Sequence, residues 1–350
     1  MKKILLVSNR VMHYRARIYN EFYDKWKKMG YEFHVVSNDY QKVDFDIRFI
    51  KHELPFGSIR YAKFINELNP QVVINFLHLK DKMIIPLTYY CKWKGIPMVY
   101  WNHGINLQDP DNKWKNAIFH YIHTISDAII LYTPDQLKYI ARKNLKKTFI
   151  AYNTLSFDNS DIFRKIIPSK ESIKNKYGIK EKYVLLYISR ILPYKGVDLL
   201  IENFKNVKDL ALVVVGGGIN DRQLNAINNT PNYYYLGEKY GDEVDEIYSI
   251  GDFFSTPGHI GLAINQAFYW GLPVFVLNRI HAPEIYYLKN GENGFMLDTM
   301  DDIKAKILHL MVHPNELLKI SYASRNTYEK RMTINMMFDG FLRTINYLNK

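Results

Sequence analysis

The chain has 350 residues, a formal net charge of +12, 47% hydrophobic and 23% charged residues. This composition is that of a folded globular protein and excludes a disordered chain, and the length predicts two domains. Cys91 is the only cysteine, which excludes an intramolecular disulfide and a thiolate metal cluster and is typical of a reducing compartment. No apolar run is long enough for a signal peptide or a membrane-spanning helix, so we expect a cytoplasmic protein.

The first half carries the whole excess of positive charge. Residues 1–170 hold 27 Lys and Arg against 15 Asp and Glu, whereas residues 171–350 hold 20 of each. Such asymmetry indicates an anionic partner, which is nucleic acid, a phospholipid surface or a phosphorylated substrate. The alternative is an ordinary solvated basic face. Nucleic acid is the least favoured partner, because the cations are scattered and no binding motif is present.

In the first half, short apolar runs alternate with longer amphipathic stretches. The runs are rich in β-branched and aromatic residues without clean alternation, which is typical of strands buried on both faces of a parallel sheet. We expect strands at 4–8, 33–36, 72–76, 98–101, 128–132 and 149–152. Helical stretches are expected between them at 15–28, 59–68, 80–94, 113–126 and 135–144.

The polar segment 156–180 contains no strand pattern and reads as a connection between domains. The alternation then restarts. Further strands are expected at 183–188, 210–215, 233–236, 253–254, 273–277 and 295–297, and helices near 196–206, 240–250, 262–270, 282–288, 301–312, 315–329 and 333–348.

The repeated strand–helix order predicts an α/β protein with two Rossmann-like, doubly wound domains facing a central cleft. We place the domains at 1–165 and 166–330 and expect the helix in 331–350 to cross back to the first. Ligands of such folds commonly bind at the carboxyl ends of the strands.

Two cations follow the first strand of the second domain. Arg190 and Lys195 lie in the segment Ser189-Arg-Ile-Leu-Pro-Tyr-Lys-Gly196. A forked guanidinium and a compact ammonium together suit a diphosphate, although two surface cations in a loop would show the same spacing.

The next expected strand ends in Gly216-Gly-Gly218, which permits positive φ angles and the close approach of a ligand, or forms a plain turn. This is not the GxGxxG fingerprint, so a nicotinamide dehydrogenase is not expected.

The segment 257–274 is the densest in chemical signals. A loop with two glycines opens a helix, whose N-terminus would direct free N–H groups at an anion. Farther on, Glu284 stands at the start of a short helix, where it would accept hydrogen bonds from a hydroxylated ligand or cap the helix.

With these residues the chain resembles family 4 of the retaining, metal-independent GT-B glycosyltransferases. The resemblance covers 183–298 through an ordered set of short motifs: Ser-Arg…Lys-Gly, the glycine cluster, Leu236-Gly237, Val244…Tyr248…Asp252, Pro257-Gly…Gly-Leu, Gly-Leu-Pro-Val and Pro-Glu…Gly…Gly-Phe. The first half is similar more loosely, through His13-Tyr-Arg15, Trp101-Asn-His-Gly104 and Tyr132-Thr133. The resemblance implies that the second domain binds a nucleotide-diphosphate sugar and the first an acceptor.

One departure from the family pattern concerns its two glutamates, which are eight residues apart. Anchoring on Gly261-Leu262 places them at Gly258 and Gln266. The first usually contacts the donor sugar and the second the ribose. An amide still hydrogen-bonds ribose hydroxyls, but Gly258 has no side chain, so His259 or Glu284 is expected to replace that contact, or the donor sugar is an unusual one.

The resemblance assigns roles to the remaining residues. Arg190 and Lys195 neutralise the leaving diphosphate, no metal or other cofactor is needed, and the donor site comprises Gly217, Gly258, His259, Gly261, Leu262, Gln266 and Glu284. The tripeptides Asp44-Phe-Asp46 and Asp109-Pro-Asp111 look like a metal-binding DxD but lie in the wrong domain, and we interpret them as solvated loop acids.

On the acceptor side the resemblance makes His103 the catalytic histidine near the transferred sugar, with a core or loop histidine as the alternative. His13, Tyr14 and Arg15 would line the acceptor site. No histidine spacing matches a zinc site.

Helix 15–28 places Ile18, Phe22 and Trp26 on one face with basic residues around it. This pattern indicates a core-packing helix or, alternatively, contact with anionic lipid headgroups. The segment 89–94 adds aromatic and basic residues to such a surface.

The expected function is therefore transfer of a sugar, with retention, from a nucleotide-diphosphate sugar to a glycan or lipid-linked saccharide. Surface polysaccharide synthesis at the inner face of the membrane would suit an anionic acceptor. The alternatives are a GT-B nucleotide-sugar 2-epimerase, which needs more cleft acids than these loops offer, and a non-catalytic partner subunit, suggested by the missing glutamates.

Overall fold

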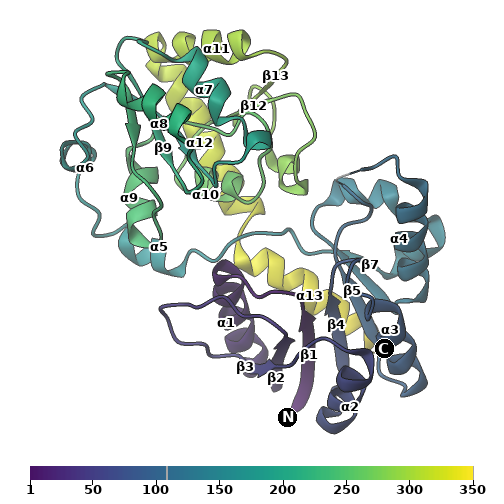
Figure 1. Cartoon of the computed structure of the whole chain (residues 1–350). Helices are drawn as coiled ribbons and strands as arrows, with labels where there is room; N and C mark the ends of the chain where they lie inside the picture. Colours follow the sequence, from purple (N-terminus) through teal and green to yellow (C-terminus); the bar gives the residue numbers. More distant parts are fainter. Residues whose placement is uncertain (108, 350) are drawn as a thin grey trace. The chain divides into compact units, whose positions relative to one another are not determined.

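The computed structural model describes residues 1–107 and 109–349. The chain divides into two compact units, Met1–Ser156 together with Thr333–Lys350, and Phe157–Met332. Figure 1 labels the helices and strands of both units.

Unit 1 is built on a parallel sheet of seven strands in the order β3-β2-β1-β4-β5-β6-β7. Its strands are β1 (Lys2–Ser8), β2 (Tyr31–Ser37), β3 (Ile50–Glu53), β4 (Val72–Phe76), β5 (Met98–Trp101), β6 (Ala128–Leu131) and β7 (Thr148–Ile150). The central strands β4, β5 and β6 are buried along their whole length, as their mainly apolar runs predict. Strand β3 was not predicted, because its four residues Ile-Lys-His-Glu form a partly exposed edge strand.

Helices cover both faces of this sheet (Figure 1). Helices α1 (His13–Lys28) and α13 (Ile334–Leu348) pack on one face, and α2 (Ser58–Leu68), α3 (Ile84–Trp93) and α4 (Lys113–Ile125) pack on the other. The helix expected at 135–144 is replaced by two 3-10 helices, η1 (Pro134–Tyr139) and η2 (Arg142–Lys147).

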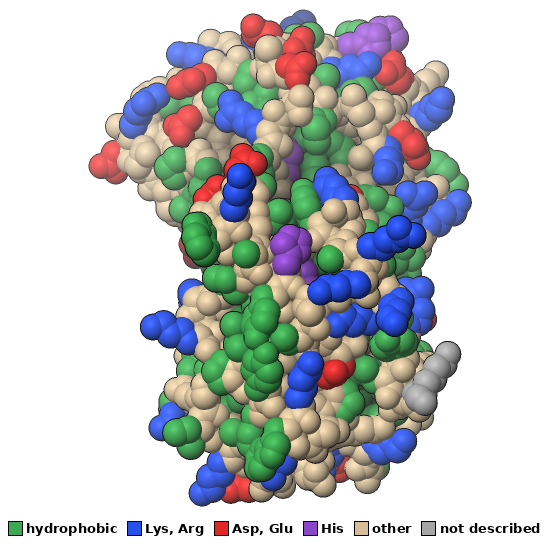
Figure 2. All heavy atoms as spheres, turned by 90° about the vertical axis from the view of Figure 1, so that its right-hand side faces the viewer, with side chains coloured by type: hydrophobic (Ala, Val, Ile, Leu, Met, Phe, Trp, Pro, Cys, Tyr) green, Lys and Arg blue, Asp and Glu red, His purple; other side chains and the backbone are tan. Residues whose placement is uncertain are grey.

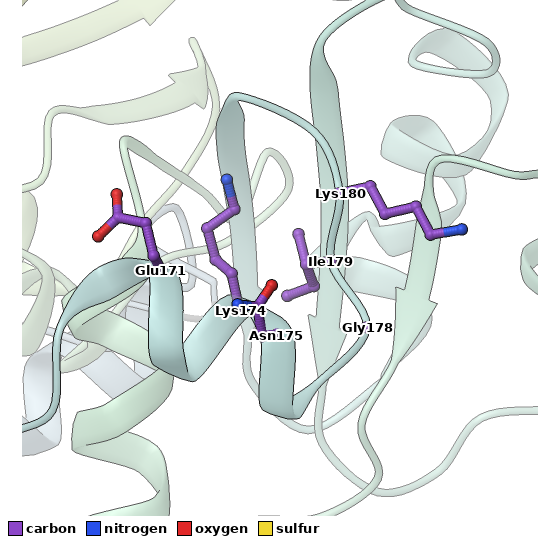
Figure 3. A pocket seen from close by; sticks show the side chains of 6 residues that line it. All are labelled: Glu171, Lys174, Asn175, Gly178, Ile179 and Lys180. Atoms are coloured by element: carbon purple, nitrogen blue, oxygen red, sulfur yellow. The ribbon is translucent and has the colours of Figure 1, made fainter.

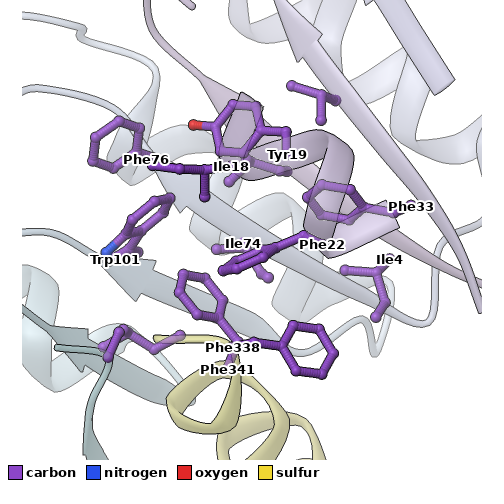
Figure 4. Close-up of a cluster of buried hydrophobic side chains, with 14 of the residues drawn as sticks. Ile4, Ile18, Tyr19, Phe22, Phe33, Ile74, Phe76, Trp101, Phe338 and Phe341 are labelled. Atoms are coloured by element: carbon purple, nitrogen blue, oxygen red, sulfur yellow. The ribbon is translucent and has the colours of Figure 1, made fainter. Parts of the chain in front are cut away.

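The apolar face of α1 lies in the core of unit 1. Ile18, Phe22 and Trp26 are at most 1% exposed, and the ring of Phe22 lies 4.9 Å from that of Phe341 on α13 and 5.4 Å from that of Phe338 (Figure 4). Of the two interpretations of this helix, core packing is therefore correct, and its apolar residues are not available to lipid.

Unit 2 is built on a second parallel sheet, with six strands in the order β10-β9-β8-β11-β12-β13. The strands are β8 (Tyr183–Ile188), β9 (Leu210–Val215), β10 (Tyr233–Tyr235), β11 (Phe253–Ser255), β12 (Val274–Leu277) and β13 (Gly294–Leu297). All six were predicted within one or two residues, because buried β-branched and aromatic runs mark them clearly.

The helices of unit 2 include three that the sequence did not predict. The elements are α5 (Asp158–Phe163), α6 (Lys170–Lys176), η3 (Pro193–Lys195), α7 (Val197–Asn203), α8 (Asp221–Asn228), α9 (Asp242–Ile250), α10 (Ala263–Tyr269), η4 (Pro283–Tyr287), α11 (Met300–Val312) and α12 (Pro314–Arg331). Short polar helices with one or two buried residues, such as α5, α6 and α8, leave almost no periodic signal.

The segment after Ser156 packs on unit 2, which moves the boundary upstream of the predicted residue 165. The ring of Phe157 stacks on that of Tyr269 at 4.4 Å, and the Ser160 hydroxyl donates to Asp245 at 2.6 Å. At the other end the chain returns to unit 1, where α13 packs on β6 and β7.

Both units are doubly wound α/β domains, which confirms the predicted fold class. The parallel sheets bring the carboxyl ends of their strands to one edge, where the loops predicted to carry chemistry emerge. Within residues 1–107 and 109–349, no helix has the length and apolar character needed to cross a bilayer.

Candidate functional site

The loop after β8 and the loop after β11 are joined through Lys195. The Lys195 ammonium donates a hydrogen bond to the His259 carbonyl at 2.8 Å. In the opposite direction the Gly258 N–H donates to the Lys195 carbonyl at 3.1 Å. The two segments that the sequence singled out therefore form one structure at the carboxyl edge of the second sheet.

Charged groups gather around the Lys195 ammonium. Burial and the nearby Arg190 guanidinium lower the pKa of Lys195 to about 8, while the Glu284 carboxylate acts in the opposite direction. Glu284 is only 3% exposed, whereas Arg190 is exposed. Arg190 and Glu284 thus lie near enough to Lys195 to influence its pKa, and two neighbouring cations suit a diphosphate.

Two histidines fix the loop that follows Gly258. The His281 Nδ1 accepts the Ile260 N–H at 3.1 Å, and its Nε2 lies 2.8 Å from the Leu277 carbonyl. Since the first partner is a donor and the second an acceptor, the neutral ring carries its proton on Nε2. His259 contacts the Ile280 carbonyl through Nδ1 at 3.0 Å. The sequence offered no signal that His281 holds this loop, because both of its partners are backbone groups.

Gly258 cannot carry a side chain in this backbone. A Cβ atom there would lie 2.1 Å from the Tyr194 carbonyl oxygen, far inside van der Waals contact. A Cβ atom added at Gly196, whose φ is +82°, would in turn lie 2.9 Å from the Gly258 nitrogen. The glutamate that the resemblance to family 4 would place at position 258 therefore does not fit this backbone.

The glycines after β9 are closely surrounded by other residues of unit 2 and do not border open space. A Cβ at Gly216 would lie 1.9 Å from the Ser189 carbonyl oxygen. A Cβ at Gly217 would overlap the Glu238 carboxylate, which also accepts a hydrogen bond from the Tyr240 hydroxyl at 2.9 Å. A nucleotide sugar that reaches Gly217 on this side would therefore contact Glu238. No motif in the sequence indicated this residue.

The helix that follows Gly261 and Leu262 is shorter than expected. Helix α10 has seven residues, with Leu262 as its N-cap. Gly261 is less confined than Gly258, because its added Cβ would meet only the Ala282 Cβ at 3.5 Å. Both residues are partly exposed, so they are placed where a ligand could reach them.

Gln266 belongs to a buried hydrogen-bond network around Asp245 on α9. The Asp245 carboxylate accepts from Ser160 at 2.6 Å, from Trp270 Nε1 at 3.0 Å and from Gln266 Nε2 at 3.2 Å. Burial raises the pKa of Asp245, and these three donors oppose the shift. An amide can donate to this carboxylate whereas an ionised glutamate cannot, which explains why glutamine stands here.

We expect Gln266→Glu to lower stability more than Gln266→Leu does. The glutamate would place an acceptor-only carboxylate beside Asp245 at a cost of about 1–3 kcal/mol, whereas leucine removes one of three donors. Because protonation restores a donor, the loss in melting temperature should shrink as the pH falls below the pKa values of the two acids. Melting curves measured against pH test this.

The matched control is the double variant Gln266→Glu with Asp245→Asn. In it the amide and the carboxylate exchange places, so that the amide at 245 can donate to the carboxylate at 266. The double variant should recover part of the lost stability. If the Gln266→Glu protein were as stable as the wild type at neutral pH, the hydrogen bond between Gln266 and Asp245 would not contribute to stability.

In unit 1, Arg15 is a buried cation surrounded by aromatic rings. It is 5% exposed and donates to the Asn153 side-chain oxygen at 3.2 Å. Its guanidinium carbon lies 4.9 Å from the ring centre of Trp101 and 5.0 Å from that of Phe76. These contacts fix the charge at the carboxyl edge of the first sheet, where β4 and β5 end.

His103 follows β5 and lies beside this cation. Its ring packs on the edge of Tyr132 at 4.4 Å, and burial, with help from His78 and Arg15, lowers the pKa of His103 to about 4. Gln136 accepts the Tyr132 N–H through Oε1 at 3.0 Å, so its Nε2 is the group 3.5 Å from His103 Nδ1. His103 is therefore neutral near pH 7, and this contact favours the proton on Nε2.

His13 and Tyr14 begin helix α1, next to Arg15. The Gln41 side-chain oxygen accepts from the His13 backbone N–H at 3.1 Å and lies 3.2 Å from His13 Nδ1. The His13 and Tyr14 rings meet edge to face. The structure thus brings His13, Tyr14, Arg15 and the surroundings of His103 to the same edge of the sheet.

The acidic tripeptides show structural contacts. Asn20 donates to the Asp46 carbonyl at 2.8 Å, and Asn112 donates to the Asp109 carboxylate at 2.9 Å. Within the described part of the chain, no cluster of three His, Cys, Asp or Glu residues is arranged to hold a metal ion.

A cavity of about 570 Å³ lies elsewhere in unit 2, against α6 (Figure 3). Its lining is Glu171, Lys174, Asn175, Gly178, Ile179 and Lys180. None of these residues belongs to the cluster around Lys195, and the Lys174 ammonium is bound to the Glu181 carbonyl. We assign no site to it.

Part of the second unit is similar to a known protein family. Residues 169–327 match the sequence profile of the family described as Glycosyl transferases group 1. Over these residues the chain is similar to that family. The matched part contains the loops around Lys195, Gly258 and Glu284, so the candidate site lies within the family's own region.

Two curated relatives carry names of glycosyltransferases. The chain is 27% identical over 287 residues to "Sulfoquinovosyl transferase SQD2" of Arabidopsis thaliana, covering 79% of this chain and 51% of the relative. It is 22% identical over 187 residues to the "GDP-mannose-dependent alpha-(1-6)-phosphatidylinositol monomannoside mannosyltransferase" of Mycobacterium tuberculosis, covering 48% of each. The chain thus matches about half the length of these relatives.

Solved structures confirm the GT-B fold. A glycosyltransferase from Rickettsia africae superposes with a TM-score of 0.74 at 16% identity, over 100% of this chain and 99% of the other. Anabaena Alr3699/HepE in complex with UDP-glucose gives 0.73 at 14%, over 99% and 100%. A UDP-N-acetylglucosamine 2-epimerase from Neisseria meningitidis gives 0.64 at 14%, over 99% and 100%. At these identities the likeness describes the fold alone.

Proposed function

We propose that the protein is a retaining, metal-independent glycosyltransferase of family 4 that uses a nucleotide-diphosphate sugar. The observation that carries this proposal is the Lys195 ammonium, which donates to the His259 carbonyl at 2.8 Å and whose pKa is lowered by burial and by the nearby Arg190, in the part of the chain that matches glycosyl transferases group 1. HepE, a structural neighbour, is described in complex with UDP-glucose.

In this proposal the bond between the sugar and the diphosphate breaks, the acceptor hydroxyl oxygen forms the new bond to the sugar, and the hydroxyl proton passes to the leaving diphosphate oxygen. Negative charge then develops on the leaving diphosphate. Arg190 and Lys195 stabilise that charge, which is commonly the largest contribution to catalysis, so we propose that no metal is required. We propose that Glu284 and His259 contact the donor sugar, because Gly258 has no side chain to do so.

We propose that unit 1 binds the acceptor at the edge formed by His13, Tyr14, Arg15 and His103. The neutral His103 ring would act there by hydrogen bonding rather than as a cation. The excess positive charge of residues 1–170 supports an anionic glycan or lipid-linked saccharide, as in surface polysaccharide synthesis at the cytoplasmic face of a membrane. The mycobacterial relative is named for a phosphatidylinositol mannoside acceptor.

A donor panel tests the proposal. One nucleotide-diphosphate sugar should raise the melting temperature and be hydrolysed slowly to the nucleoside diphosphate. Activity should survive EDTA, because two cations take the place of a metal. Activity lost to EDTA and restored by Mn²⁺ or Mg²⁺ would contradict the metal-independent mechanism, and no stabilisation by any nucleoside diphosphate would favour a non-catalytic partner subunit.

The epimerase is the second candidate, because a solved 2-epimerase shares the fold. It is separated from transfer by incubating the nucleotide sugar alone. A C2 epimer of the intact nucleotide sugar would identify an epimerase, whereas release of nucleoside diphosphate supports the transferase.

A further inference from the structure

Unit 1 presents two Lys-Trp-Lys tripeptides to solvent. Lys92-Trp-Lys94 lies at the end of α3, and Lys113-Trp-Lys115 begins α4. Trp93 is 75% exposed and Trp114 is 86% exposed, whereas Trp26 and Trp101 in the same unit are fully buried. Exposure of two indoles, each between two lysines, is not explained by the core of unit 1.

Each tryptophan belongs to an exposed apolar stripe along its helix. On α4 the exposed residues Trp114, Ile118 and Tyr121 are spaced by four and three positions, which places them on one face. The opposite face of α4 is buried through Phe119 and Ile122. Helix α4 is therefore apolar on both its core side and part of its solvent side.

A contact between α3 and α4 joins the two stripes. Exposed Tyr89, one turn before Trp93, meets Tyr121 with the two hydroxyl oxygens 2.5 Å apart. Strands β4, β5 and β6 are parallel, so α3 and α4 run in the same direction. The stripe from Trp114 through Tyr121 and Tyr89 to Trp93 is then about 16 Å long, at roughly 1.5 Å per residue.

The space-filling view shows this surface. Figure 2 looks at the molecule from the side of α3 and α4, and hydrophobic side chains form an elongated patch there with Lys and Arg side chains near it. We call Tyr89, Trp93, Trp114, Ile118 and Tyr121 the aromatic stripe.

The charges around the aromatic stripe are of one sign. Helices α3 and α4 contain no Asp or Glu among their 23 residues. Exposed lysines flank both tryptophans, at positions 92, 94, 113 and 115. The Lys94 ammonium nitrogen lies over the Trp93 ring, 4.7 Å from the ring centre, which is a cation–π contact.

We propose that the aromatic stripe docks unit 1 on an anionic lipid bilayer. Trp and Tyr prefer the headgroup level of a membrane, and lysines beside them attract anionic lipids. A protein partner fits less well, because lysine is depleted in protein interfaces. The surface differs from the one that helix 15–28 suggested, since the apolar residues of that helix are buried.

This inference deepens the proposed lipid-linked acceptor, but its test needs no sugar transfer. The full chain is sedimented with vesicles of phosphatidylcholine alone and of phosphatidylcholine mixed with phosphatidylglycerol, at low and high salt. We expect binding to the anionic vesicles only, weakened by salt. A protein that binds vesicles but transfers no sugar would overturn the proposed function and leave this inference intact.

Variants locate the surface. Trp93→Ala with Trp114→Ala should lower vesicle partitioning at least about ten-fold, and each lysine changed to glutamine should lower it about five-fold at low salt. The side chains are exposed, so folding is not at stake. The matched control is Ile166→Ala with Tyr322→Ala, two unit 2 residues that are each 74% exposed, and it should bind as the wild type does.

Three results would overturn the inference. They are no binding of the wild type to anionic vesicles at low salt, undiminished binding of the double tryptophan variant, and light scattering that shows a dimer which the tryptophan variant dissociates. The last result would assign the aromatic stripe to a second copy of the chain.

Discussion

Replacing Lys195 with alanine is expected to lower kcat/KM for the nucleotide sugar at least about ten-fold. The lost charge-assisted contact with the diphosphate accounts for roughly 1.5–3 kcal/mol. The same change removes the hydrogen bond to the His259 carbonyl, so the melting temperature should fall as well. Initial rates across donor concentrations and thermal unfolding measure the two effects.

Arg190→Ala is the matched variant that separates the loss of kcat/KM from the loss of melting temperature. Arg190 is exposed, so its loss should reduce kcat/KM by a similar factor while leaving the melting temperature unchanged. If both variants fold and keep the wild-type kcat/KM, the diphosphate does not bind at this pair of cations.

The pH profile gives an independent measurement of the same site. Because the pKa of Lys195 is lowered to about 8, the ammonium is charged at neutral pH and loses its proton as the pH rises through 8. We expect kcat/KM to fall over that range. Lys195→Arg stays charged, so in this variant kcat/KM should fall only at higher pH. An unchanged pH profile in this variant would show that another group causes the fall in kcat/KM.

The sequence predicted most of the fold because the strands of both sheets are buried runs. The run 210–215 is apolar throughout, the run 72–76 is apolar apart from Asn75, and the ends of both agree with β9 and β4. What the sequence missed was short and polar. Helix α6 buries only Ile173, and the edge strand β3 is held by hydrogen bonds to β2 rather than by an apolar pattern.

The candidate site was predicted as a set of residue types but not as a set of contacts. Arg190, Lys195 and Glu284 were selected from motif order, and the structure places them within electrostatic reach. Sequence spacing could not show that Glu238 lies over Gly217 or that Asp245 holds Gln266. Those partners come from other strands and helices, and only the folded chain brings them together.

Gly258→Glu, which restores the family residue, is expected to abolish activity rather than improve it. The added Cβ would lie 2.1 Å from the Tyr194 carbonyl oxygen and 2.9 Å from the Lys195 carbonyl carbon. Both are backbone atoms that cannot rotate away. The loops of Lys195 and His259 would have to separate, at a cost of about 3 kcal/mol or more, and the Lys195 ammonium would leave its position.

Two alanine variants show whether the cause is steric. Gly258→Ala adds the same Cβ without a charge and should lower the melting temperature and the donor kcat/KM almost as much as the glutamate does. Gly261→Ala, three residues on, meets only the Ala282 Cβ at 3.5 Å and should be tolerated. If Gly258→Ala were as stable and active as Gly261→Ala, the two loops would not approach as described. A Gly258→Glu protein more active than the wild type would return the donor-sugar contact to position 258 and remove the need for Glu284 or His259 to supply it.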